Sequence, residues 1–241
     1  KLLRLPSFRI LPCQACYACL FRDGCTQNDQ LGQVLEALSQ ADALVLAAPA
    51  YFLGPNSCLK SLLDRGLSFY SRADSLWGKP AVGAAIAGIP GKEGYTKLAV
   101  DSFLRCILAD IRGSGVFYGA MPGEVLQDRD NLARMGELAE ALEGRREASS
   151  GFCPVCGGDT FRFLTPGRVR CLLCNSEGEA APSREGISLR MQQESGDMHA
   201  DRERALGHAD WLRGMKERYK EKKRELVPLC TAYRSTGEWI E

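Results

Sequence analysis

The stretch Ala41-Asp-Ala-Leu-Val-Leu-Ala-Ala-Pro-Ala-Tyr-Phe52 decides the fold class of this chain. Its central run, Ala43 to Ala48, is apolar at every position, and such a short unbroken run is typical of a strand buried on both faces of a parallel sheet. Comparable runs stand at Ala81 to Ala87 and Gly115 to Gly119, with a shorter one at Lys1 to Leu5. We expect these four segments to be strands.

Helical periodicity fills the gaps between the expected strands. Apolar side chains recur at helical spacing in four segments: Leu31 to Leu38, Leu59 to Leu67, Leu98 to Leu108 and Leu132 to Leu142. Strands that alternate with helices predict an α/β fold with a parallel sheet. We place this first domain at residues 1–144.

The composition describes a protein with a hydrophobic core and little charge bias. Of its 241 residues 45% are hydrophobic, and 31 Lys and Arg stand against 30 Asp and Glu. The balance gives no sign of a polyanionic partner. The longest apolar run, Ala43 to Ala50, is far shorter than the roughly 18 residues of a membrane span. We therefore expect a cytoplasmic protein that binds neither membrane nor nucleic acid.

Eleven cysteines are many for such a chain, and eight of them form two tight clusters. Cytosolic thiols stay reduced, so clusters with this spacing bind metal more often than they form disulfides. The other three, Cys58, Cys106 and Cys230, stand alone among apolar or helix-forming neighbours. We expect these three to be packing residues.

The first cluster is Cys13-x2-Cys16-x2-Cys19-x5-Cys25, on a loop before the Leu31 helix. Three cysteines separated by two residues each, with a fourth shortly downstream, favour a cubane iron-sulfur cluster. A structural zinc ion usually takes two separated pairs of ligands, and it remains the alternative, ahead of free thiols.

The second cluster belongs to a different module. A polar stretch, Arg145 to Gly151, predicts a linker, and the module that we place at residues 151–180 follows it. Its ligands are spaced Cys153-x2-Cys156-x14-Cys171-x2-Cys174, around a strand expected at Thr160 to Leu164. This spacing is typical of a zinc ribbon, although four thiolates could also hold a single iron, as in rubredoxin.

The end of the chain predicts one long helix. Residues Ser176 to Ala200 are polar with little periodicity, whereas Asp201 to Leu226 carries a helical apolar face. Its basic residues alternate with acidic ones, such as Glu217 with Lys220, which is the pattern of a solvated helix face. A nucleic-acid-binding ribbon is therefore the weaker reading.

With the cysteines placed on an α/β chain, the arrangement resembles the iron-sulfur flavoprotein branch of the flavodoxin-like, NADPH-dependent FMN reductase superfamily. The similarity runs through Gly144. Four stretches carry it: Pro12-Cys-Gln-Ala-Cys-Tyr-Ala-Cys19, Ala41 to Phe52, Leu59-Lys-Ser-Leu-Leu-Asp-Arg65 and Pro122-Gly-Glu124. The resemblance implies a five-stranded sheet, FMN at the carboxyl ends of the strands and a [4Fe-4S] cluster near the flavin.

The resemblance also implies particular site residues. Pro49, Ala50, Tyr51 and Phe52 would line the flavin ring, helped by Gly88 after the next strand. Ala48 stands where many relatives have Ser, so one hydrogen bond to the flavin would be lost. The interpretation that needs no ligand is that Tyr51 and Phe52 pack in the core. Lys60, Asp64 and Arg65 are expected to orient a helix or a subunit contact rather than to do chemistry.

The resemblance differs at the front, since the family begins with a strand, a phosphate-binding loop and a helix that would precede Lys1. A sheet without its central strand would expose apolar edges. We expect about 30 to 40 further residues upstream, enough for one such unit.

These features predict an oxidoreductase that passes electrons between a ferredoxin-like one-electron donor and a small two-electron acceptor, through the cluster and FMN. No side chain qualifies as an acid, base or nucleophile, and a dimer or tetramer is expected. One alternative is an NAD(P)H-dependent FMN or quinone reductase. The other is a non-enzymatic zinc-binding scaffold.

Overall fold

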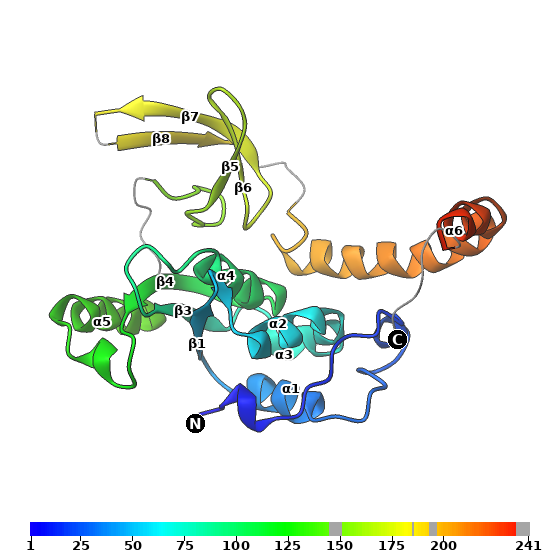
Figure 1. The fold of residues 1–241 in the computed structure, drawn as a ribbon, viewed down its shortest axis with the longest axis horizontal. Helices are drawn as coiled ribbons and strands as arrows, with labels where there is room; N and C mark the ends of the chain where they lie inside the picture. The colour runs from blue at the N-terminus through cyan, green and yellow to red at the C-terminus, as the bar shows by residue number, and fades with distance from the viewer. Residues whose placement is uncertain (145–150, 185, 193–196, 235–241) are drawn as a thin grey trace.

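The computed structural model describes residues 1–144, 151–184, 186–192 and 197–234. Two sheets organise this part of the chain. A mostly parallel sheet with its helices forms the larger body, and a separate antiparallel sheet lies above it (Figure 1). The predicted α/β class with a small C-terminal module is confirmed.

The larger sheet has the strand order β2-β1-β3-β4. Three of its strands are parallel: β1 (Leu44–Tyr51), β3 (Pro80–Ala87) and β4 (Asp110–Tyr118). The short β2 (Gly54–Pro55) folds back antiparallel to the end of β1. β4 begins well before the predicted Gly115, because the more polar residues from Asp110 onward pair with the start of β3.

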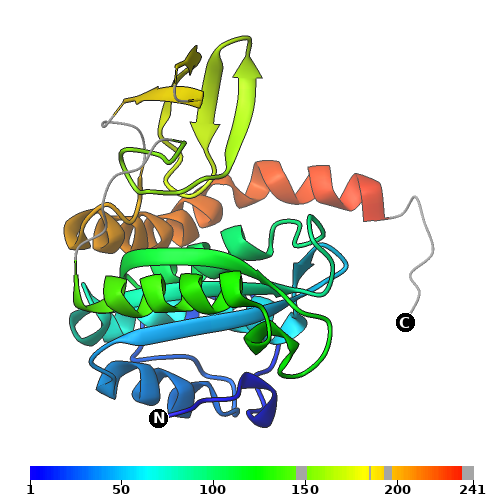
Figure 2. The ribbon, with the colours of Figure 1, turned by 90° about the vertical axis from the view of Figure 1, so that its left-hand side faces the viewer.

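Helices cover the two faces of this sheet unequally. α1 (Leu31–Gln40), α2 (Ser57–Asp64) and α4 (Thr96–Cys106) pack on one face and form the main core with alternate residues of β1 and β3. α5 (Arg129–Glu143) covers the other face beside β4 (Figure 2). The four predicted helices are confirmed, although α2 ends at Asp64, and a 3-10 segment, η3 (Gly66–Arg72), and the short α3 (Ala73–Leu76) follow it.

The strand predicted at Lys1 to Leu5 is wrong. Residues there are irregular and lead into a 3-10 turn, η1 (Leu5–Ser7), with Pro6 in its first turn. Proline has no N–H to give to a sheet, so this segment does not extend a strand. Its apolar side chains, including Leu3 and Leu5, instead pack against the core.

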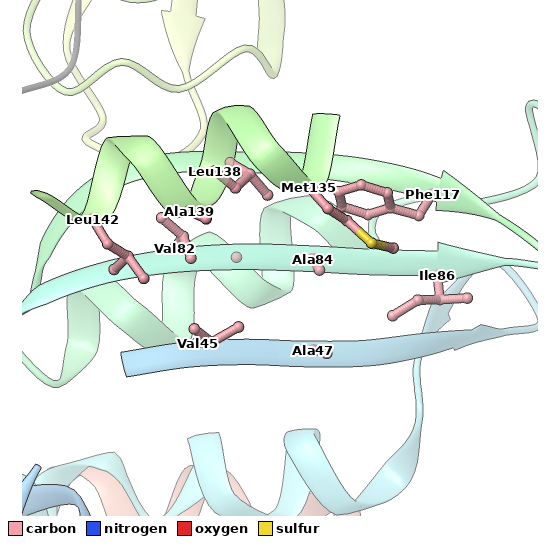
Figure 3. A pocket seen from close by; sticks show the side chains of 11 residues that line it. Val45, Ala47, Val82, Ala84, Ile86, Phe117, Met135, Leu138, Ala139 and Leu142 are labelled. Atoms are coloured by element: carbon pink, nitrogen blue, oxygen red, sulfur yellow. The ribbon is translucent and has the colours of Figure 1, made fainter. Parts of the chain in front are cut away.

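An apolar groove of about 320 Å³ lies on the α5 face of the sheet, where α5 packs on β3 and β4 and no described element covers β1 (Figure 3). Val45 of β1 is 70% exposed there, although its neighbour Leu44 points into the core. Side chains of α5, such as Met135 and Leu138, form the other wall. None of the residues that line the groove has an ionisable side chain. The strand-loop-helix unit expected upstream of Lys1 stays a prediction.

The second sheet has four antiparallel strands in sequence order: β5 (Phe161–Thr165), β6 (Arg168–Cys171), β7 (Glu177–Ser183) and β8 (Gly186–Met191). The predicted strand in this module is confirmed as β5. The hairpin of β7 and β8 was not expected, because its polar residues show little alternation. Most of the predicted linker, residues 145–150, lies outside the described residues.

The last helix, α6 (Arg202–Arg234), starts beneath the small sheet and runs along the larger body (Figures 1 and 2). Its first turns pack Ala205 against Ala73 and Leu108, and Arg202 pairs with Asp74. The helix extends beyond the predicted Leu226. No helix in the described ranges has the length and apolar character needed to cross a membrane.

Candidate functional site

The carboxyl end of β1 presents two aromatic side chains to solvent. Phe52 and Leu53 adopt left-handed backbone conformations, with φ of 50° and 66°, and these turn the chain back into β2. Tyr51 is 62% exposed and Phe52 fully exposed, so the interpretation as core residues is wrong. Non-glycine residues adopt this conformation at a cost of about 1–3 kcal/mol each, and such strain is common at binding sites.

The ends of β3 and β4 lie against one another beside this turn. A Cβ on Gly88 would lie 3.4 Å from the Cα of Ala120, so the two loops approach closely at a residue without a side chain. Glu124 shapes the second loop by accepting hydrogen bonds from the backbone N–H groups of Ala120 (2.6 Å) and Met121 (2.8 Å). Glu124 therefore acts on the backbone of the loop.

Two polar residues at this edge were missed by sequence reasoning. The Tyr118 hydroxyl, at the end of β4, donates a hydrogen bond to Glu93 Oε2 at 3.2 Å. Asn131 is buried and binds the same strand end, since its side-chain N–H₂ donates to the carbonyl of Tyr118 at 2.9 Å. The position of Tyr118 at the end of an apolar strand could have pointed to it, but its partners are distant in sequence: Glu93 precedes α4, and Asn131 lies in α5.

This edge suits a flat, partly apolar cofactor such as FMN. Exposed aromatic rings at Tyr51 and Phe52 can flank an isoalloxazine ring, and the carboxyl ends of parallel strands are where open α/β sheets bind ligands. Pro49 and Ala50 are half-buried and support the turn. Ala48 is buried in the main core, so its side chain faces away from this edge.

The first cysteine cluster lies on an irregular loop that surrounds the 3-10 turn η2 (Ala18–Leu20). Cys13 and Cys16 are exposed, whereas Cys19 and Cys25 are half-buried. Burial raises the pKa of the Cys19 thiol; a hydrogen bond from Ser68 opposes this, and the charges of Cys25 and Cys13 add to it.

The backbone of this loop is shaped around sulfur. Ala15 and Tyr17 adopt left-handed conformations, with φ of 51° and 58°. The Ala15 N–H donates to Cys13 Sγ at 3.4 Å. N–H groups aimed at ligand sulfurs are a feature of iron-sulfur sites, so the loop has the donor set and backbone that such a cluster needs.

Buried and surface contacts hold both ends of this loop. Arg65, at the end of α2, forms an ion pair with Asp29 at 2.6 Å and donates to the carbonyl of Leu11 at 2.7 Å. α6 reaches the middle of the loop, where Arg213 donates to the carbonyl of Leu20 at 2.6 Å. The expectation that Lys60, Asp64 and Arg65 are structural agrees with these contacts, since Lys60 pairs with Asp64 on α2.

The second cysteine cluster is assembled as a metal site. The four Sγ atoms of Cys153, Cys156, Cys171 and Cys174 lie within 4.8 Å of one another. Cys153 and Cys174 are 3.8 Å apart, and Cys156 and Cys171 are 3.5 Å apart. A tetrahedron with Zn–S bonds of about 2.3 Å has edges of about 3.8 Å, so the group suits one zinc or iron ion.

Local turns aim these thiols inward. Gly157 N–H donates to the carbonyl of Cys153 at 2.7 Å, and Asn175 N–H to the carbonyl of Cys171 at 3.0 Å. Hydrogen bonds from the other three thiols, Cys156 first, lower the pKa of Cys153, while the bond with Cys153 raises the pKa of Cys156, so the thiols share protons that a metal would displace. In the described part of the chain this is the one cysteine group already closed to metal-binding distances, since the first cluster is more open.

The three lone cysteines differ in their surroundings. Cys106 packs against the main core, and burial raises its pKa to about 12. Cys58 is half-buried on α2. Cys230 is exposed on α6, so its assignment as a packing residue is wrong, because no described element covers that part of the helix.

Comparisons with known proteins agree with this arrangement. Residues 1–109 match the family model of NADPH-dependent FMN reductase. An iron-sulfur flavoprotein of Archaeoglobus fulgidus is 28% identical over 143 residues, which cover 58% of this chain and 64% of that protein. A second one from the same organism is 30% identical over 149 residues, covering 61% and 76%. The chain thus spans slightly less than two thirds of the first relative.

A solved structure titled flavone reductase has the same fold, with a TM-score of 0.73 at 17% identity. The match covers the whole of this chain and 88% of that one, so it includes the antiparallel sheet and the long helix. The family model and the relatives agree with the carboxyl edge of the sheet and the two cysteine groups described above. The chain belongs to the NADPH-dependent FMN reductase family of oxidoreductases, and its relatives are named iron-sulfur flavoproteins.

Proposed function

We propose that this protein passes electrons between a ferredoxin-like one-electron carrier and a small two-electron acceptor, through a [4Fe-4S] cluster and FMN. The loop of Cys13, Cys16, Cys19 and Cys25 carries the proposal, since its base is closed by the buried pair of Arg65 with Asp29. Helix α2 joins the two proposed cofactor sites. It begins shortly after the turn at Phe52 and Leu53 and ends next to Arg65. Eight residues of helix span about 12 Å.

Bound FMN would supply both one-electron and two-electron chemistry. The side chains of Tyr51 and Phe52 would flank the ring, and their exposure leaves the edge open to a small acceptor. The four thiolates would hold the cluster, with Cys13 and Cys16 on the exposed side of the loop, where a carrier protein could approach.

The C-terminal group supports a structural role for its metal. Three of the four thiols are buried and Cys156 is half-buried, and four thiolates complete a tetrahedral site, so no position would be open to a substrate. We assign zinc, with iron as the alternative that metal analysis distinguishes. We also propose a homo-oligomer, a dimer or tetramer.

Stopped-flow mixing of the anaerobic, cofactor-loaded protein with each donor tests the electron source. A reduced ferredoxin should bleach the flavin at least about tenfold faster than NADPH, equivalent to about 1.4 kcal/mol in barrier. The Cys19→Ala variant should lose the ferredoxin route and keep any slow direct reduction. A Cys230→Ala variant, which changes an exposed thiol outside both clusters, should behave as the parent does.

The second candidate is a reductase in which NADPH gives hydride directly to FMN. The family model carries this name, and the exposed Phe52 leaves room for a nicotinamide to stack. Rapid bleaching by NADPH that survives in Cys19→Ala would favour it. Zinc in both cysteine groups and no FMN would instead favour the scaffold, for which the closed second cysteine group is the supporting observation.

A further inference from the structure

Arg65 is the largest fully buried side chain in the described part of the chain. Its residue is only 2% exposed, although a guanidinium is strongly hydrated in water. It lies where α2 ends and η3 begins, behind the loop of the first cysteine cluster. A buried cation in this position requires an explanation beyond helix packing.

The two terminal nitrogens of Arg65 close the base of the cysteine loop. Nη1 donates to Asp29 Oδ2 at 2.6 Å and to the carbonyl of Leu11 at 2.7 Å, and Nη2 donates to Asp29 Oδ1 at 3.4 Å. Asp29 in turn accepts from the N–H groups of Leu11 (2.9 Å) and Leu31 (3.1 Å). Leu11 precedes Cys13 and Asp29 follows Cys25, so one ion pair fixes both ends of the loop that carries all four thiols.

The remaining donor, Nε, is buried and has no hydrogen-bond partner in the described part of the chain. Buried donors rarely stay unpaired, because the lost hydration is not replaced. Besides Asp29, the residue whose side chain acts on Arg65 is Cys25, a half-buried ligand of the proposed cluster, so its sulfur is the acceptor that we consider for Nε–H. An arginine guanidinium is not deprotonated in proteins, so Arg65 stays charged.

We propose that Arg65 tunes the reduction potential of the cluster held by this loop: its unpaired Nε–H would donate to the sulfur of Cys25 when the cluster is bound, with the Asp29 carboxylate as the opposing charge. The inference rests on the proposed function. A bound cluster that accepts one electron from the carrier would gain one negative charge, while Arg65 would neither gain nor lose a proton. A fixed cation beside a ligand sulfur stabilises that reduced state and raises the potential.

The test removes the positive charge of Arg65 in one variant and the negative charge of Asp29 in another. The midpoint potential of the cluster is measured by an anaerobic, EPR-monitored titration of the full chain, after iron and sulfide analysis. Arg65→Gln should lower the potential, and Asp29→Asn should raise it, each by about tenfold in the reduction equilibrium, or about 59 mV for one electron. Arg65→Lys, which keeps the charge but loses Nε, should lie between the parent and Arg65→Gln.

Arg22→Gln is the matched control, because Arg22 is on the same loop but exposed to solvent. Its charge is screened by water, so the potential should stay close to that of the parent. A purely structural clamp would shift Arg65→Gln and Asp29→Asn in the same direction, which would overturn the proposal.

If Arg65→Gln does not retain iron, the Asp29→Asn variant tests the proposal alone. A midpoint potential of Asp29→Asn equal to or below that of Arg22→Gln would contradict tuning. If neither variant binds iron after reconstitution, the pair serves only assembly, and the tuning proposal fails. Absence of iron and sulfide from the parent would contradict the proposed function itself, which keeps the two failures distinct.

Discussion

At the scale of single residues, the position of each cysteine decides its chemistry. Cys106 is half-buried against the core, and a Cβ on Gly66 would lie 2.7 Å from its sulfur. Cys230 stands on an exposed part of α6. Thiolate, not thiol, reacts with alkylating agents, so these two lone residues should differ in reactivity.

We expect Cys106 to resist alkylation by iodoacetamide at pH 8 while Cys230 reacts. Burial raises the pKa of Cys106 to about 12, so on the order of one molecule in 10⁴ has the thiolate at that pH. Reactivity should increase only as the pH approaches that value. Peptide mass spectrometry after a short labelling pulse measures both sites, and equal labelling rates would contradict the burial of Cys106.

Replacing one ligand of the first cluster should separate the two metal sites. Cys16 is exposed, so Cys16→Ala removes a ligand without disturbing the core. We expect loss of iron and of the broad cluster absorbance, with the metal of the second group retained, because the two groups lie on separate segments. Elemental analysis beside a Cys230→Ala control checks this. Parallel loss of both metals would count against separate sites.

At the scale of elements, β1 has two different faces. Leu44 contributes to the core with α1 and α2, whereas Val45 lies at the open groove beside α5. The strand is buried on one side and largely open on the other, although its sequence is apolar throughout.

Substitutions at these neighbouring positions should therefore differ in their effect on stability. Leu44→Ala should lower the free energy of unfolding by about 2–5 kcal/mol, since it removes buried methyl groups. Val45→Ala should change it by less than about 1 kcal/mol, because the side chain is exposed. Urea unfolding of both variants measures the difference. An equal loss would mean that Val45 is covered in solution.

At the scale of the whole molecule, the C-terminal module is attached to the larger body by charged contacts. Lys97 of α4 pairs with Asp159 of the module at 3.1 Å, and Arg105 pairs with Asp197 before α6. The hydrophobic core of the module consists mainly of its own cysteines and their neighbours, such as Val155 and Phe161. Its stability should therefore depend on the metal more than on the body.

The variant Cys171→Ser should release that metal and loosen β5–β8, while the α/β body stays folded. Metal analysis and limited proteolysis would show the release and cleavage within residues 151–192. Far-UV circular dichroism should retain the helical signal, and Cys58→Ser serves as a control outside the clusters. Unfolding of the whole chain would show that the module supports the body. If the released ion is iron, the group is a rubredoxin-like site instead.

The sequence by itself determined the α/β class, the three parallel strands, four of the five helices of the body and the four cysteines of the second metal group. These features are local, because buried strands are continuous apolar runs and a metal knuckle is made by two cysteines a few residues apart. The hairpin of β7 and β8 escaped prediction because polar strands without alternation look like loops.

Only the tertiary structure decided which residues meet across the chain. Asp29 lies 36 positions from Arg65, and Leu20 lies 193 positions from Arg213, so no pattern in the sequence pairs them. The same holds for Leu44 and Val45, which are both apolar, while only the placement of the helices separates a buried side chain from an exposed one. The spacing of residues in the sequence predicts local interactions, whereas burial and long-range charge pairs depend on how the elements pack.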